Sequence, residues 1–174
     1  VKWHYDRVLD PDVTSTGVVA TIRSIVDSVV VNDTLTFTFN LTAPDRSFLS
    51  ALIDFPGAVA SPTAVLEANS YSDPTGEFGR NPVGAGAFMF ESWAPDQSVK
   101  VTRNPNYFLE GLPYLDSIIY QHIPDPQTRI AMIRTGETDF IGGGASDFNA
   151  KDLPLVEGNP NLKIITLPRT RTYT

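Results

Sequence analysis

The 174-residue sequence has no cysteine, which excludes disulfide bonds, thiolate metal ligands and cysteine nucleophiles. It has only two histidines, His4 and His122, and neither has a second histidine at a spacing typical of metal ligands. We therefore expect both to be structural or surface residues, and we expect neither a metal site nor a cofactor.

The sequence also has no cluster of basic residues and no apolar run long enough to span a membrane. Its formal net charge of −7 argues against a nucleic-acid partner or an anionic lipid surface, both of which would require a basic face. No signal peptide precedes Val1, and the sequence ends on "RTRTYT" without an obvious closing element. We expect both ends to be cut from a longer polypeptide, so the missing signal says nothing about localisation.

Catalytic signatures are missing as well. The sequence has no Gly-x-Ser-x-Gly elbow, and no serine is paired with a histidine in a recognisable local pattern. Glu137 and Asp139 are two residues apart and resemble an acid/base pair, but they follow a predicted helix end, where Arg129 or Arg134 can neutralise them. A structural ion pair is the favoured interpretation, and we predict no catalytic residues and no enzyme.

Two glycines one residue apart stand in "NPVGAGAFMF", at Gly84 and Gly86. A dinucleotide-binding loop needs a third glycine three positions later and a helix that starts there, whereas this stretch continues into the alternating, aromatic-rich "AFMFESW". The pattern therefore predicts a strand and not a phosphate site, and the two glycines need another explanation.

Hydrophobic periodicity and turn residues predict short helices alternating with strands. The best-marked helix follows Asp125 as N-cap, starts at Pro126 and ends at Gly136, with Ile130 and Ile133 on one face. Other predicted helices contain Tyr5, Val8 and Leu9, or cover Ser47–Asp54, the residues after the Ser61 cap, and Asn149–Glu157. The predicted strands are Ser28–Val31 and Leu35–Leu41, joined by an Asn32-Asp33 turn, then Ala87–Trp93, Ser98–Arg103, Ser117–Ile123 and Leu162–Leu167.

The triple glycine Gly142–Gly144 leaves two interpretations open. Consecutive glycines are typical of a flexible surface loop, but they also let a backbone approach a ligand closely and present its N–H and C=O groups.

Two stretches, "NPVGAGAFMFESWAPDQSVKVTRNPNYF" and "PYLDSIIYQHIPDPQTRIAMIRTGETDF", resemble the extracellular solute-binding proteins of family 5. These are the peptide- and nickel-binding receptors of ABC importers. Val1–Asp10 and Val29–Leu41 match the family pattern more loosely, and Ala85 replaces a threonine that is common in the family's turn. The resemblance implies that Gly84 and Gly86 mark the point where the chain enters the main sheet of the ligand-binding lobe, where glycine permits a tight corner and close backbone packing.

The resemblance implies an α/β (mixed α+β) fold, with a mixed sheet flanked by helices, that forms part of the N-terminal lobe of a type II periplasmic binding protein. It implies an accessory subdomain at 1–81, a ligand-binding sheet subdomain at 82–168 and the start of a crossing strand at 169–174. By the same resemblance, the ligand contacts fall on Ile141, Gly142, Gly143 and Tyr173, although Tyr173 equally suits a core aromatic residue near the hinge.

The implied function is the receptor component of an ABC importer, extracytoplasmic in the periplasm or at the cell surface, with lipid anchoring as one option. Its implied partners are an oligopeptide or other small solute, a membrane permease and the C-terminal lobe of the same protein. Two alternatives stay open: a sensor or chaperone that works without a transporter, and an unrelated hydrolase.

Overall fold

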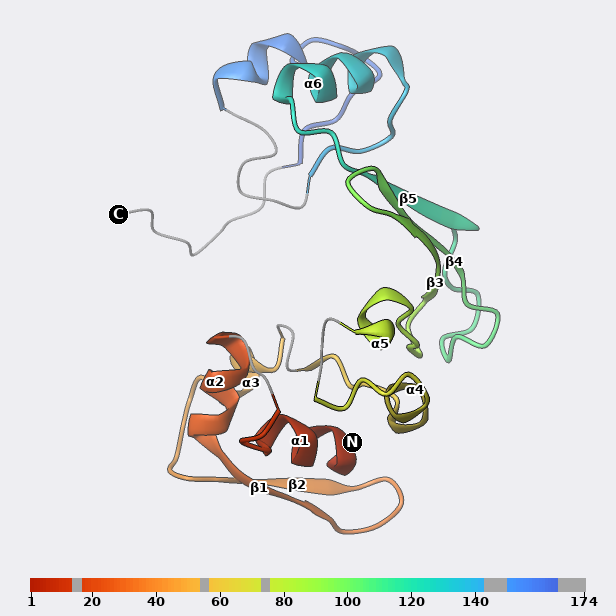
Figure 1. Ribbon diagram of the computed structural model, residues 1–174. Coiled ribbons are helices and arrows are strands. Elements are labelled where there is room, and N and C mark those ends of the chain that lie inside the picture. The colour runs from red at the N-terminus through yellow and green to blue at the C-terminus, as the bar shows by residue number, and fades with distance from the viewer. Residues whose placement is uncertain (14–16, 54–56, 73–75, 143–149, 166–174) are drawn as a thin grey trace. The chain divides into compact units, whose positions relative to one another are not determined.

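The computed structural model of the chain (Figure 1) describes residues 1–13, 17–53, 57–72, 76–142 and 150–165. The chain divides into two compact units, Val1–Tyr120 and Gln121–Thr174, and each unit is described by itself below. The subdomain limits implied by the resemblance stay a prediction.

The core of the first unit lies between two helices and a hairpin. Helices α1 (Lys2–Leu9) and α2 (Gly17–Ile25) pack beside strands β1 (Val26–Val31) and β2 (Phe37–Leu41), as Figure 1 shows. The strands are antiparallel. The buried side chains that form this core are Tyr5, Val8, Ile22, Val26 and Val29. Each fully buried aliphatic side chain contributes about 1.5–3 kcal/mol, so this cluster is the main stabilising element of the unit.

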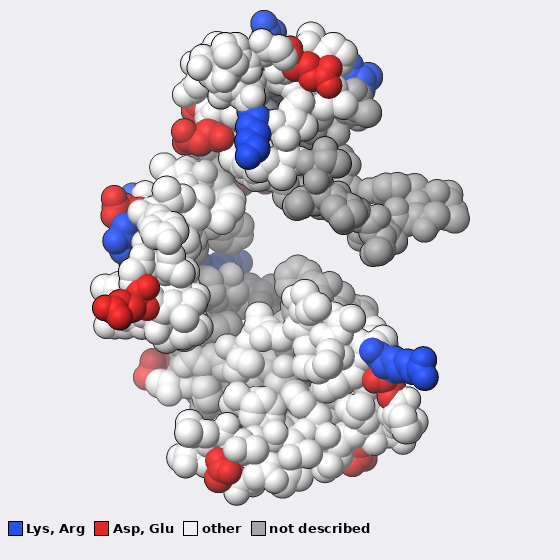
Figure 2. Space-filling view, turned by 180° about the vertical axis from the view of Figure 1, so that it is seen from behind, with Lys and Arg blue, Asp and Glu red and all other residues white. Residues whose placement is uncertain are grey.

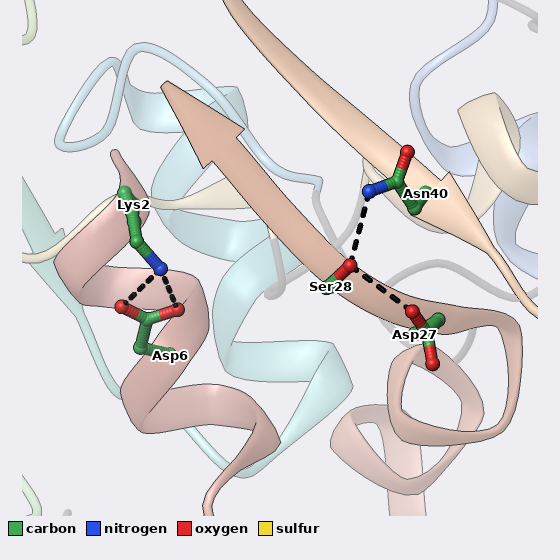
Figure 3. Close-up of polar contacts among 5 residues, drawn as sticks. All are labelled: Lys2, Asp6, Asp27, Ser28 and Asn40. Atoms are coloured by element: carbon green, nitrogen blue, oxygen red, sulfur yellow. Dashed lines mark hydrogen bonds and ion pairs between the residues drawn. The ribbon is translucent and has the colours of Figure 1, made fainter.

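Polar contacts on the outside of this core are local (Figure 3). Lys2 and Asp6 form an i,i+4 ion pair of 2.7 Å on α1. Across the hairpin, the Asn40 amide donates to the Ser28 hydroxyl, which donates to the Asp27 carboxylate, both at 3.0 Å. These groups are exposed, so each contact contributes well under about 1 kcal/mol.

Arg23, on α2, stabilises the end of α1 and the turn after it. Its guanidinium donates to the carbonyl oxygens of Val8 at 2.6 Å, Asp10 at 2.6 Å and Val13 at 2.9 Å. The last carbonyls of a helix have no partner within the helix. Arg23 therefore joins α2 to the chain segment that leaves α1.

The remaining helices of this unit are short: α3 (Phe48–Ala51), α4 (Pro62–Glu67) and α5 (Glu77–Arg80). The predicted cap of α4 is confirmed, because the Ser61 hydroxyl accepts from the backbone N–H of Ala64. The first unit also contains the sheet of β3 (Phe88–Ala94), β4 (Ser98–Arg103) and β5 (Ser117–Gln121), in the order β3-β4-β5.

The second unit contains α6 (Pro126–Thr135) and the 3-10 helix η2 (Ala150–Leu155). Both predicted ends of α6 are confirmed. The Asp125 carboxylate accepts a hydrogen bond from the N–H of Thr128, and Gly136 ends the helix in the left-handed conformation with φ of 76°. Ile130 is buried on this helix, and Ile133 is half-buried.

Two local predictions are wrong, and one helix was missed. Helix α2 was not predicted, because its β-branched residues resemble a strand. The first hairpin has a loop of residues 32–36 and not a two-residue turn, since the Asn32 N–H bonds to the Thr36 carbonyl and β2 starts at Phe37. The described residues of the predicted last strand, Leu162–Ile165, have no strand pairing.

The prediction for Gly84 and Gly86 is also wrong within this chain. Neither glycine has a positive φ. A Cβ at Gly84 would meet no atom within 4 Å, and one at Gly86 would lie at an ordinary 3.9 Å from the Phe88 carbonyl oxygen. Neither a strained corner nor a close backbone contact requires glycine at these two positions.

Candidate functional site

The predicted ligand-binding segment follows α6 directly, and the end of that helix fixes where it starts. The N–H of Gly136 bonds to the Ile133 carbonyl, and the N–H of Glu137 bonds to the Met132 carbonyl at 2.9 Å. This arrangement of a left-handed glycine and two backward hydrogen bonds is a common helix C-terminal motif.

At the other end of α6, the hydrogen bonds from Thr128 hold the pKa of the Asp125 carboxyl below its ordinary value.

Within the segment, Phe140 and Gly142 lie against each other. A Cβ on Gly142 would sit 2.8 Å from Cζ of the Phe140 ring, which is too close for two carbon atoms. The ring itself is 71% exposed, and the hydroxyl of Thr138 donates to the Phe140 carbonyl at 3.3 Å. The absence of a side chain at Gly142 therefore makes room for an aromatic ring that lies on the surface.

The peptide groups of the next two residues are not used by the described part of the chain. Among the described residues, none forms a hydrogen bond with the backbone of Ile141 or Gly142. Ile141 is half-buried, and Gly142 is exposed. Backbone N–H and C=O groups are strong hydrogen-bonding groups, so an extended ligand could pair with them.

The other two predicted site residues, Gly143 and Tyr173, lie outside the described residues. The structure thus brings Ile141 and Gly142 together with Phe140, a residue that the sequence analysis did not select. The only hint in the sequence was that Phe140 stands two positions before Gly142.

A buried carboxylate in the second unit also escaped the sequence analysis. Asp152, on η2, is 5% exposed, and its Oδ1 accepts from the Gln127 amide at 3.1 Å. Its Oδ2 has no hydrogen-bond partner in the described part of the chain. In sequence, Asp152 looks like an ordinary surface residue at a helix start, so no pattern indicated its burial.

The two histidines take structural or surface positions, as predicted. His4 is buried, and its Nδ1 accepts from the N–H of Ala60 at 3.2 Å, while His122 is exposed. Within the described ranges, no three metal-ligating side chains come together.

The predicted ion pair of Glu137 or Asp139 with an arginine of α6 is not formed among the described residues, which include all of these side chains. Both carboxylates are exposed, because they lie in a turn after the end of α6 where water can solvate them.

Charged side chains are scattered over the face in Figure 2, and neither sign gathers into a patch there. The prominent ion pairs are local, such as Lys100 with Glu91 at 2.6 Å and Arg103 with Asp116 at 2.9 Å. In the part of the chain that the structure describes, no helix has the length and apolar character needed to cross a bilayer.

The architecture is that of periplasmic binding proteins, which confirms the predicted fold class. The family described as "Bacterial extracellular solute-binding proteins, family 5 Middle" matches residues 1–174. The chain belongs to this family, and the binding proteins of this family are extracytoplasmic.

Relatives with named ligands support the assignment. The chain is 31% identical to "Glutathione-binding protein GsiB" of Salmonella paratyphi A over 97% of its length. It is 31% identical to "Oligopeptide-binding protein AppA" of Bacillus subtilis over 74% of its length. The solved structure of the oligopeptide-binding protein AppA from Bacillus subtilis with a nonapeptide covers 94% of the chain with a TM-score of 0.75 and 26% identity.

The chain spans only part of these relatives: 30% of GsiB and 22% of AppA in the sequence comparison, and 31% of the AppA chain in the structural comparison. Both relatives are binding proteins by name. What the whole protein binds, and with which partners, is therefore a matter for a proposal.

Proposed function

We propose that this chain forms part of the receptor component of an ABC importer, which binds a peptide or similar solute by lobe closure and delivers it to a membrane permease. The observation that carries the proposal is the family match over the whole of residues 1–174. The peptide-bound AppA structure, superposed over 94% of the chain, supports the peptide class of ligand. The receptor would act outside the cytoplasm, in the periplasm or at a cell surface with a lipid anchor, and without catalysis.

We assign the ligand contacts to Ile141, Gly142, Gly143 and Tyr173. The geometry of the first two supports this, because their peptide groups are not used by the described residues and a surface ring lies beside them. Pairing through the main chain suits a receptor for peptides of varied sequence, since every peptide offers the same backbone groups.

When the two lobes close, the ligand contacts both of them, so each lobe contributes only part of the binding free energy. Micromolar affinity corresponds to about −8 kcal/mol, and a ligand held from one side only keeps part of it. Residues 1–174 alone are therefore expected to bind in the millimolar range or more weakly, whereas a polypeptide that also contains the C-terminal lobe binds far more tightly.

Calorimetry with short peptides and with glutathione tests this proposal. In the two-lobed polypeptide, Gly142→Val is expected to weaken peptide binding at least tenfold, because a branched side chain blocks access to the backbone. Gly84→Val is the matched control, since the space around Gly84 is open. The double variant Gly142→Val/Phe140→Ala should stay weak, which separates a blocked backbone from a displaced ring.

Unchanged peptide affinity in both Gly142 variants would refute the assigned contacts. Tight peptide binding by residues 1–174 alone would refute the two-lobe mechanism.

A further inference from the structure

The β1–β2 hairpin carries two Asn-x-Thr triplets, Asn32-Asp33-Thr34 and Asn40-Leu41-Thr42. Both fit the acceptor motif for N-linked glycosylation, which allows any residue except proline in the middle. This modification is found on proteins that leave the cytoplasm, and the binding proteins of this family are extracytoplasmic. A motif this short also arises by chance, so the structural setting of each triplet decides whether its asparagine can be modified.

The first triplet lies in the loop between the two strands. Residues 32–38 are all exposed, and Leu35, the residue after the triplet, is 94% exposed. The N–H groups of Asn32 and Asp33 both bond to the Thr36 carbonyl, at 3.0 and 3.2 Å. The Asp33 carboxylate accepts from the N–H of Leu35 at 2.8 Å. These contacts hold a turn in which the whole triplet faces solvent.

The fold does not use the two side-chain groups that the motif requires. Asn32 accepts a hydrogen bond from the Thr38 hydroxyl through its Oδ1, at 2.8 Å. Its amide nitrogen Nδ2 has no hydrogen-bond partner among the described residues. The Thr34 hydroxyl also lacks one in the part of the chain that the structure describes. An enzyme can therefore bind both groups without first breaking a contact within the chain.

The second triplet is held in the sheet. Asn40 lies in β2 opposite Ser28 of β1, and its amide donates to the Ser28 hydroxyl at 3.0 Å (Figure 3). The Thr42 hydroxyl donates to the carbonyls of Ser24 and Ile25, at 3.1 and 3.2 Å, and the Thr42 N–H bonds to the Ile25 carbonyl at 2.9 Å. An enzyme could extract this triplet only by separating β2 from β1 and from the end of α2.

Apolar side chains around the loop favour a glycan on the first triplet. Val31 is 53% exposed, Leu35 is 94% exposed and Phe37 is 40% exposed. A hydrated oligosaccharide attached to Asn32 would shield these side chains from other molecules. It would not disturb the core, because Val29, the nearest buried residue of β1, lies three residues earlier in the chain.

We propose that Asn32 is the attachment site of an N-linked oligosaccharide and that Asn40 is not modified in the folded protein. Nδ2 of Asn32 forms a bond to the anomeric carbon of the first sugar of a lipid-linked oligosaccharide. The bond between that carbon and the oxygen of the lipid phosphate breaks, and the phosphate leaves with the bonding electrons. The amide gives up one proton, so the step is a substitution without oxidation or reduction.

Mass spectrometry of the complete protein, purified from the cells that naturally produce it, tests the proposal. The protein is expected to be heavier than its amino-acid sequence, and peptide mapping is expected to place a glycan on Asn32. Asn32→Gln and Thr34→Ala should each remove this mass completely. Thr34→Ser keeps the hydroxyl of the motif and should retain the glycan.

The second triplet supplies the matched controls. Asn40→Gln and Thr42→Ala destroy the same motif in the same hairpin and should leave the glycan on Asn32 unchanged. Circular dichroism shows whether each variant is folded. If Thr42→Ala does not fold, Asn40→Gln carries the comparison, because the Asn40 side chain is exposed and lies outside the core.

A wild-type protein without a glycan on Asn32 would overturn the proposal, as would a glycan on Asn32 that survives Thr34→Ala. Equal modification of Asn32 and Asn40 would also overturn it, because the folded hairpin would then not select between the triplets. A glycan on Asn32 alone supports it, whether or not the protein binds peptides.

Discussion

Replacing Arg23 by alanine tests whether one side chain joins the two helices of the first unit. Its guanidinium donates to the carbonyl oxygens of Val8, Asp10 and Val13 at 2.6, 2.6 and 2.9 Å. Without it, the carbonyls at the end of α1 lose charge-assisted partners, and no other turn of the helix can supply them.

The expected loss follows from the number of bonds and their exposure. A hydrogen bond with one charged partner contributes about 1.5–3 kcal/mol, but the three bonds share one side chain and are not additive. Arg23 is half-buried, so water can reach part of the vacated site. We therefore expect Arg23→Ala to lower the free energy of unfolding by about 2–4 kcal/mol, a large share of the 5–15 kcal/mol typical of a domain.

Urea denaturation followed by circular dichroism measures this change, with the slope of the transition checked for constancy. Arg46→Ala is the matched control: it removes the same charge from an exposed arginine that forms no hydrogen bond or ion pair with the described residues. It is expected to change stability by less than about 0.5 kcal/mol. If the two variants lose the same free energy, the loss comes from net charge and the capping argument fails.

Three further results are expected. Ile22→Ala removes a fully buried side chain and should destabilise the protein by about 2–5 kcal/mol in the same urea assay. Gly136→Ala, at a φ of 76°, should cost about 1–2 kcal/mol, whereas Gly84→Ala should be neutral or slightly stabilising; equal losses would contradict the backbone argument. Thr128→Val should raise the pKa of Asp125 toward its ordinary 3.8, because the Thr128 hydroxyl is the main cause of the depression. A lowered pKa means that the folded state favours the ionised Asp125 carboxylate. The stability that this cap contributes is therefore present above pH 3.8 and is lost as the pH falls through the folded-state pKa. NMR titration of the Asp125 carboxyl measures the change in pKa directly.

Elements whose ends carry specific chemistry were predicted well. Asp125, Pro126 and Gly136 each act through the backbone groups of α6, so the sequence alone locates both ends of that helix. The strands Phe88–Ala94 and Ser98–Arg103 were equally visible from their alternation. In each case the determining interactions are local.

Helix α2 was missed because its formation depends on tertiary contacts. Its sequence, "GVVATIRSI", is rich in β-branched residues that lower helix propensity. Val19 and Ile22 nevertheless lie three residues apart on α2 and pack in the core, and Ile22 is fully buried there. Packing against α1 and β1 outweighs local propensity, and Arg23 adds its contacts from the same helix.

The candidate site was harder to locate for a different reason. A catalytic site is often recognisable from side chains of particular chemistry at particular spacings. The proposed main-chain contacts with a peptide would use atoms that every residue has. In a sequence, glycine is the one residue that suggests an accessible backbone, but it also has other roles. Gly136 ends a helix, and Gly142 makes room for the Phe140 ring. No described residue forms a hydrogen bond with the backbone of Ile141 or Gly142, and this is a property of the folded backbone that composition and spacing do not encode.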